Sequence, residues 1–314
     1  MKKYIELGNR TGPKPTPIKP FLRWAGGKRR LADLIIEAFP ETFDAKSNNY
    51  FEPFLGGGAI VFALADSNRD FGISGKNLYL NDSNPDLITT YKVVKNNVEA
   101  LTKRLSRLSL DTSKEAYEKI RASKPLDDVS KAARFIYLNK TCFNGLWRVN
   151  SKGDFNVPWG KLKKPHIYDE DHLLACSKWL KGSHLTRGDF TKSLERANRG
   201  DIVYFDPPYI PLTASANFSK YSKDDFSIRD HERLAELISK LKKRGVCVIL
   251  SNSDTSLSRE IFGQVLTLRQ ISVNRSIAAD GSSRKPVMEV IGTSFPVPRD
   301  SQLSRCNIVG GTKR

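Results

Sequence analysis

The tetrapeptide Asp206-Pro207-Pro208-Tyr209 holds the residues of this sequence that are best suited to chemistry. It follows residues 201–205 (DIVYF), an apolar and β-prone run, so an acid stands at the end of a predicted buried strand. Proline locks the backbone φ angle, and the two prolines therefore hold the neighbouring groups on a stiff chain. The motif offers two fixed hydrogen-bond acceptors, the Asp206 carboxylate and the Pro207 carbonyl, together with an aromatic face.

A glycine turn lies upstream, within residues 50–64 (YFEPFLGGGAIVFAL), which read as a strand, a turn and the start of a helix. Gly56 and Gly58 allow the backbone to approach a ligand closely, where helix N–H groups face outward. Asp82 ends the next predicted strand, where a Rossmann-like site places an acid on ribose hydroxyls. Because the turn is not G-x-G-x-x-G, tight packing explains it equally well, and the acid in register is what favours a cofactor site.

Glu52 adds a second carboxylate at the end of the first strand. It would repel the pyrophosphate of a dinucleotide and attract a cation. This charge favours S-adenosylmethionine, whose ammonium and sulfonium groups are both positive, over NAD. Residues 21–28 (FLRWAGGK) add a glycine pair, a ring and a cation, although Trp24 also suits a core position and Lys28 a solvated surface.

The composition points to a polyanionic partner. The chain of 314 residues has 52 Lys and Arg against 34 Asp and Glu, a net charge of +18, which favours nucleic acid through counterion release. Many basic proteins are merely soluble, so charge alone does not decide. The apolar runs are too short to span a bilayer, and the four cysteines and four histidines show neither disulfide nor zinc spacing. We therefore expect a cytoplasmic protein without a metal.

The elements that must position these residues alternate along the chain. Strands are predicted at 50–53, 77–81, 201–205 and 246–250, and helices at 59–66, 85–98 and 228–244. This alternation predicts an α/β fold with a doubly wound parallel sheet. Residues 99–135 are mostly helical by pattern and 141–165 are irregular and basic, which indicates an insertion.

Four motifs in this order, FLRWAGGK, FEPFLGGG, LNDSNPDLI and DPPY, resemble the DNA adenine-N6 methyltransferases typified by the Dam enzymes (D12 class, or class alpha). FNGLWRVNSKGDFNVPWG, PLTASANFSKYS, SNSDT and RSIAADGSSRK extend the resemblance over most of residues 21–293. DPPY alone is only moderately specific, but the ordered set is very specific.

The resemblance implies a Rossmann-like, S-adenosylmethionine-binding catalytic domain made of residues 21–98 and 184–298. It implies an inserted, mainly helical target-recognition domain at 99–183. We expect a flexible basic lead-in at 1–20 and a loose tail at 299–314. The expected cofactor-binding residues are Trp24, Lys28, Glu52, Phe54, Gly56, Gly58, Asp82, Asp189, Phe190 and Asp206, of which Asp189 is equally compatible with a plain turn acid.

Adenine N6 is a poor nucleophile because its lone pair is delocalised into the ring. Acceptors on its two N–H groups, the Asp206 carboxylate and the Pro207 carbonyl, would free that lone pair for methyl transfer. Tyr209 offers a face on which the base stacks. An adenine within a duplex cannot present its amine in this way, so we expect it to be flipped out.

Residues 140–165 interleave aromatics, amides and cations, as expected for a segment that reads bases and phosphates. The resemblance places Arg148 against guanine and favours GATC as the site. Asn144 and Pro158 are candidate base contacts, and Lys161, Lys163 and Lys164 are candidate phosphate contacts, although each lysine alone is more typical of a solvated face. A predicted hairpin near the end carries Arg275, Arg284 and Lys285, which could grip the backbone.

Several alternatives stay open. A cytosine-N4 or RNA adenine-N6 methyltransferase is disfavoured because those families more often have Ser or Asn in place of Asp206. A catalytically dead DNA-binding regulator is disfavoured because Lys28, Asp82, Asp206 and Tyr209 are all present. Cytosine-C5 chemistry is set aside because no cysteine follows a proline. We expect a nucleoid-associated enzyme, monomeric when free, that acts on double-stranded DNA in a restriction–modification, phage or solitary regulatory role.

Overall fold

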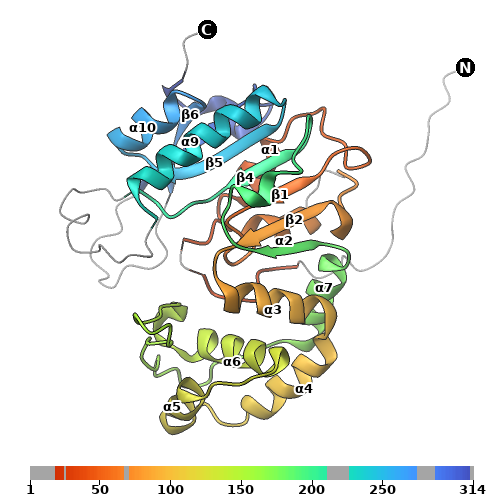
Figure 1. The fold of residues 1–314 in the computed structure, drawn as a ribbon, viewed down its shortest axis with the longest axis vertical. Coiled ribbons are helices and arrows are strands. Elements are labelled where there is room, and N and C mark those ends of the chain that lie inside the picture. Colours follow the sequence, from red (N-terminus) through yellow and green to blue (C-terminus); the bar gives the residue numbers. More distant parts are fainter. Residues whose placement is uncertain (1–17, 25, 67–70, 211–225, 274–286, 312–314) are drawn as a thin grey trace, which may run out of the picture.

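The computed structural model describes residues 18–311 except 25, 67–70, 211–225 and 274–286 (Figure 1). Within these residues, eight strands form one sheet in the order β3-β2-β1-β4-β5-β7-β6-β8. The strands are β1 (Tyr50–Glu52), β2 (Leu78–Asp82), β3 (His184–Arg187), β4 (Ile202–Phe205), β5 (Cys247–Ser253), β6 (Thr267–Val273), β7 (Val287–Thr293) and β8 (Ile308–Gly310).

The sheet has a parallel and an antiparallel part. Strands β1 to β5 pair in parallel, as the sequence predicts. β7 pairs antiparallel with both β5 and β6, and β8 pairs antiparallel with β6. The hairpin predicted within residues 275–290 lies mostly outside the described residues, which resume at 287 with β7, and its partner strand β6 was not predicted. Residues 299–314 were predicted to form a loose tail, but within them β8 forms an edge strand of the sheet. A strand of three residues is too short to show an alternation of apolar and polar residues in the sequence.

Helices flank the strands and follow the predicted boundaries closely at 59–66 and 228–244. The predicted helix that runs into Val98 is divided at Asn97, whose φ of −140° lies outside the helical range. The helices are α1 (Ala32–Glu37), α2 (Ala59–Ala65), α3 (Pro85–Asn96), α4 (Val98–Leu108), α5 (Lys114–Ala122), α6 (Asp128–Thr141), α7 (Glu170–Leu180), α9 (Ile228–Lys243) and α10 (Ser256–Gly263). None of these helices is long and apolar enough to cross a membrane.

The central strands β1 and β4 are buried on both faces, which makes the sheet the middle of three layers. Tyr50 and Tyr204 point into a core that contains the buried faces of α1, α2 and α3. Their neighbours Phe51, Val203 and Phe205 point into the opposite core, against α9 and α10. This alternation along each strand is what a doubly wound sheet requires, and the predicted α/β class is confirmed.

A helical layer extends the first core away from the sheet. In Figure 1, α4, α5 and α6 lie beyond α3, on the side away from the strands. The core continues into this layer without a break, through buried Tyr117 on α5 and Phe135 on α6. The irregular segment predicted at 141–165 has only a short 3-10 helix, Phe143–Gly145, and the isolated bridges Cys142–Trp159 and Val149–Phe155. The predicted lead-in lies outside the described residues up to residue 17.

Candidate active site

The loops that follow β1, β2, β3 and β4 meet at the carboxyl edge of the sheet, where ligands bind in open α/β folds. Asn81, buried on β2, ties three of them together. Its amide donates to the carbonyls of Pro53 and Gly188 over 3.1 and 3.0 Å, and its backbone carbonyl accepts from the Leu55 N–H over 2.9 Å. Asn81 was not predicted to be a site residue. A polar residue immediately before the acid at the strand end, Asp82, could have indicated it.

The Asp206 carboxylate lies directly after β4, and one of its two oxygens, Oδ1, is bound by neighbouring side chains. Its Oδ1 accepts from the Lys28 ammonium at 3.1 Å and from the Ser251 hydroxyl at 2.8 Å. Ser251 is bonded in turn to the Tyr204 hydroxyl at 2.9 Å. No described residue donates to Oδ2. Burial raises the pKa of Asp206 above its ordinary value, although Lys28 and Ser251 oppose the shift.

Tyr209 is fixed at both its hydroxyl and its ring. The hydroxyl donates to Glu289 Oε2 on β7 over 2.6 Å. The Lys28 ammonium lies 4.4 Å from the ring centroid, which is a cation–π contact. Lys28 is only 6% exposed and also donates to the Gly26 carbonyl over 2.5 Å. Lys28 therefore contacts both the acid and the aromatic residue of the DPPY motif.

Asp82 supports the glycine turn. Its two carboxylate oxygens accept from the N–H groups of Gly56 and Asn84, each over 2.9 Å. Burial raises the pKa of Asp82 although these N–H groups oppose the shift. Gly56 (φ 48°) and Gly58 (φ 73°) both adopt the left-handed conformation, and a Cβ on Gly56 would lie 2.8 Å from the Trp24 indole. Tight packing against Trp24 is therefore one reason for glycine at this turn.

Glu52 is 2% exposed and its Oε2 accepts from the Tyr50 hydroxyl over 2.9 Å. Burial raises the pKa of Glu52 to about 8. Without a cation beside it, the side chain is therefore mostly protonated at neutral pH. A buried acid with this pKa is poised to ionise when a positive group arrives.

The loop after β3 carries Asp189 and Phe190. Asp189 Oδ2 accepts from Arg233 over 2.5 Å, and Oδ1 accepts from the Thr191 N–H over 2.8 Å. Burial alone would raise the pKa of Asp189, but these partners hold it below its ordinary value. The Phe190 ring lies 5.3 Å from that of Phe54. The two rings form an apolar wall beside the turn, and Asp189 carries an ion pair that its sequence context did not predict.

Residues 140–165, called the recognition segment after the role that the sequence predicts, are exposed where base contacts are expected. Arg148 donates from Nε to Asn156 Oδ1 over 2.8 Å and from Nη2 to the Asn156 carbonyl over 3.3 Å. Asn144 is exposed with φ 54°, and the Pro158 carbonyl accepts from the Phe143 N–H. The three lysines Lys161, Lys163 and Lys164 are exposed, while Arg275, Arg284 and Lys285 lie outside the described residues.

A buried amide links this segment to the FLRWAGGK motif. Asn139, fully buried at the end of α6, accepts from the Arg23 N–H over 2.8 Å and donates to the Arg23 carbonyl over 2.7 Å. The same amide donates to the Gly145 carbonyl over 3.2 Å. The start of the recognition segment therefore lies beside the residues that lead to Trp24 and Lys28. Asn139 was not predicted to be a structural link, because its partner Arg23 is distant in the chain.

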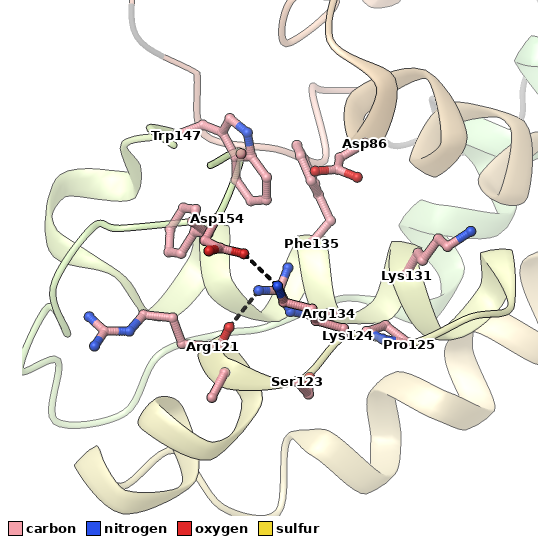
Figure 2. A pocket seen from close by; sticks show the side chains of 13 residues that line it. Asp86, Arg121, Ser123, Lys124, Pro125, Lys131, Arg134, Phe135, Trp147 and Asp154 are labelled. Carbon is pink, nitrogen blue, oxygen red and sulfur yellow. Dashed lines mark hydrogen bonds and ion pairs between the residues drawn. The ribbon is translucent and has the colours of Figure 1, made fainter. Parts of the chain in front are cut away.

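Figure 2 shows a basic pocket on the helical layer. Its volume is about 480 Å³. Aromatic side chains from α6 and from residues 147–155 form part of its lining. Arg134 stands near its centre and donates to the backbone carbonyls of Ile120 and Arg121. Lys124 pairs with Asp154 at 2.9 Å across the pocket. The cations that line the pocket are Arg121, Lys124, Lys131 and Arg134. None of these four was predicted from the sequence to contact DNA.

The sequence model of the D12 class N6 adenine-specific DNA methyltransferases matches residues 24–277. The chain belongs to this family. Its members are S-adenosylmethionine-dependent enzymes that act on DNA, and the resemblance found in the sequence motifs is thereby confirmed.

Curated relatives match almost over their full lengths. The type II methyltransferase M.MjaIII of Methanocaldococcus jannaschii is 42% identical over 85% of this chain and 96% of its own length. The type II methyltransferase M1.LlaDCHI of Lactococcus lactis subsp. cremoris is 38% identical, and the DNA adenine methylase of Escherichia coli K12 is 35% identical. Both of these matches cover 88% of this chain and 96% of the relative. The chain is thus an adenine-specific DNA methyltransferase.

Proposed function

We propose that the enzyme methylates N6 of an adenine that is flipped out of duplex DNA into the edge formed by Asp206 and Tyr209. The proposal rests on the contacts of the Asp206 carboxylate. Lys28 and Ser251 donate to Oδ1, whereas none of the described residues donates to Oδ2. An acceptor oxygen that is held in a fixed orientation is what an exocyclic amine requires.

The protein's part in the reaction is to orient the amine. Asp206 Oδ2 and the Pro207 carbonyl accept one N–H each, which draws the nitrogen toward tetrahedral geometry and frees its lone pair. Tyr209 stacks on the base with the ring face opposite Lys28. When bound, S-adenosylmethionine supplies an electrophilic methyl group. Lys28 favours the ionised form of Asp206, whose carboxylate can then also accept the proton that the nitrogen loses.

The residues present fit S-adenosylmethionine. Glu52 is a buried acid that ionises at the approach of a cation, and Phe54 with Phe190 provides an apolar wall. The turn at Gly56 and Gly58 brings the backbone close, and the remaining members of the proposed set are Trp24, Asp82, Asp189 and Asp206. Lys28 acts in this proposal mainly on Asp206, because its ammonium is already engaged there.

We further propose GATC as the recognition site and Arg148 as its guanine contact. Asn156 engages Nε and one side of Nη2, which leaves the Nη1 edge of the guanidinium available to donate to a base. Exposed Lys161, Lys163 and Lys164 and the pocket cations of Figure 2 supply positive charge for phosphates. The enzyme is proposed to be a monomer when free.

Transfer of radiolabelled methyl groups to matched duplexes with and without GATC tests the proposal. Incorporation into adenine of the GATC duplex alone supports it. Equal labelling of both duplexes removes the site assignment, and label in cytosine or only in RNA overturns the substrate. Digestion of DNA from expressing cells by methylation-sensitive nucleases gives an independent readout of the same site.

A further inference from the structure

His231 is a buried titratable residue to which the reaction above assigns no role. It lies on α9 and is 2% exposed. Its Nε2 is 2.9 Å from the Pro208 carbonyl oxygen, and its Nδ1 is 2.9 Å from the Ser227 carbonyl oxygen. Phe226 packs edge-on against the imidazole at 4.7 Å, and Phe262 of α10 lies at 6.1 Å. The ring is therefore fixed in position between the catalytic motif and a helix.

The DPPY backbone has few ways of being held. Proline has no N–H, so Pro207 and Pro208 cannot donate to the surrounding structure. The Pro207 carbonyl is the one that the proposed reaction reserves for the substrate amine. Of the backbone polar groups of the two prolines, only the Pro208 carbonyl is then left to bind the rest of the protein. His231 occupies that carbonyl.

The two contacts of His231 have different consequences. Both partners are carbonyl oxygens, which only accept, so a neutral ring donates one of the two bonds and an imidazolium donates both. Burial lowers the pKa of His231, while its two carbonyl partners and Asp230 on the same helix oppose the shift. The bond from Nε2 reaches the catalytic motif, and the bond from Nδ1 reaches Ser227, the N-cap of α9. Either bond could account for a histidine here, so the experiment must separate them.

We propose that His231 is a positioning residue for methyl transfer, which fixes the Pro208 carbonyl through Nε2 and thereby aims the Pro207 carbonyl and the Tyr209 ring. This inference rests on the proposed function of the DPPY motif. Tyr209 is anchored at its far end by Glu289, so His231 and Glu289 hold the motif from two sides. A small rotation of the Pro207–Pro208 peptide would move the acceptor away from the amine without opening the fold.

Three variants test the proposal. The amide nitrogen of His231→Gln falls near the position of Nε2 and can restore the bond to Pro208. That of His231→Asn falls near Nδ1 and can restore only the bond to Ser227. His231→Phe keeps an aromatic ring and removes both bonds. Exposed His184→Gln, at the start of edge strand β3, is the matched control. Single-turnover methylation, affinity for S-adenosylmethionine and for duplex DNA, and Tm are measured for each.

We expect His231→Gln to recover most of the wild-type rate. His231→Asn and His231→Phe should lose about 10- to 100-fold in single-turnover rate, with DNA and cofactor affinities unchanged, since misplacement of a reacting group by about 1 Å costs a factor of this order. Equal losses of rate in the two amide variants, or a rate loss in His231→Asn that is matched by an equally specific loss of Tm, would assign His231 to the fold alone and overturn the proposal. A wild-type rate in His231→Phe would do the same. An inactive wild-type enzyme would instead contradict the proposed function.

Discussion

Lys28 binds the Asp206 carboxylate at 3.1 Å and also lies 4.4 Å from the centre of the Tyr209 ring. One ammonium thus contacts both the acid and the aromatic residue of the DPPY motif. Because the Lys28 charge favours the ionised carboxylate while burial opposes it, loss of this ammonium would raise the pKa of Asp206 further.

Replacement of Asp206 by Asn should lower kcat by about 10²- to 10³-fold, the usual cost of removing one acceptor or donor from a preorganised site. DNA affinity should stay close to wild type, because the carboxylate contacts the amine and no phosphate. Filter binding and single-turnover kinetics measure the two quantities, with exposed Asp300→Asn as control. Turnover at the wild-type rate would remove Asp206 from the reaction, and loss of cofactor binding would assign it to the cofactor.

Replacement of Lys28 by Met should move the acid limb of the kcat–pH profile to higher pH. The sign follows from the pKa of Asp206: burial raises it and Lys28 lowers it, so loss of Lys28 raises it further. The reactive form is the carboxylate, which then requires a higher pH. An unshifted acid limb in Lys28→Met would show that the ammonium does not control Asp206.

Cofactor affinity should depend on pH through Glu52. Its pKa is about 8 without a ligand, so a cation that binds beside it at lower pH must displace one proton. Affinity for S-adenosylmethionine should rise by up to about tenfold per pH unit below pH 8 and level off above it. Calorimetry in buffers of different ionisation enthalpy should detect the released proton. Glu52→Gln should lose both effects, and a wild-type pH dependence in that variant would place the linked proton elsewhere.

Arg148→Ala should lose discrimination at one base pair. A guanidinium that donates to guanine O6 and N7 contributes about 1–3 kcal/mol at that position only. The variant should slow on GATC but lose little on a duplex whose guanine pair is already altered, as measured by kcat/KM on both. Slowing by the same factor on the two duplexes would make Arg148 a backbone contact.

The sequence predicts the central strands well because their signals are local. The strands at 50–53, 77–81, 201–205 and 246–250 match β1, β2, β4 and β5 with ends that differ by at most about three residues. Continuous apolar runs mark strands that are buried on both faces. The outer strands β3 and β8 and the short helix α1 were not predicted. Half-exposed or short elements carry too few buried positions to form a pattern, as the exposed residues of His184–Arg187 illustrate.

The DPPY motif was predicted to be the reaction centre from its own residues, but the groups that hold it were not predicted. Ser251, Glu289 and His231 come from β5, β7 and α9, which are distant from residue 206 in the chain. Nothing in their local sequence marks them as partners of Asp206, Tyr209 or Pro208. Their roles depend on the sheet order, in which β7 returns beside β5, and that order is a property of tertiary packing.

Asn139 makes three hydrogen bonds, two to Arg23 and one to Gly145. These bonds limit how the recognised DNA sequence could be re-engineered. A Cβ on Gly145 would lie 2.6 Å from Cβ of Arg23, and Gly145 itself has φ 64°. A foreign recognition loop grafted at Phe143 would place this contact across the junction, and a misfit there would displace Arg23 and the FLRWAGGK segment that leads to Lys28. A graft that begins at Leu146 leaves the contact intact. Loop exchange at that second junction should therefore yield chimaeras that change their site preference and keep their turnover.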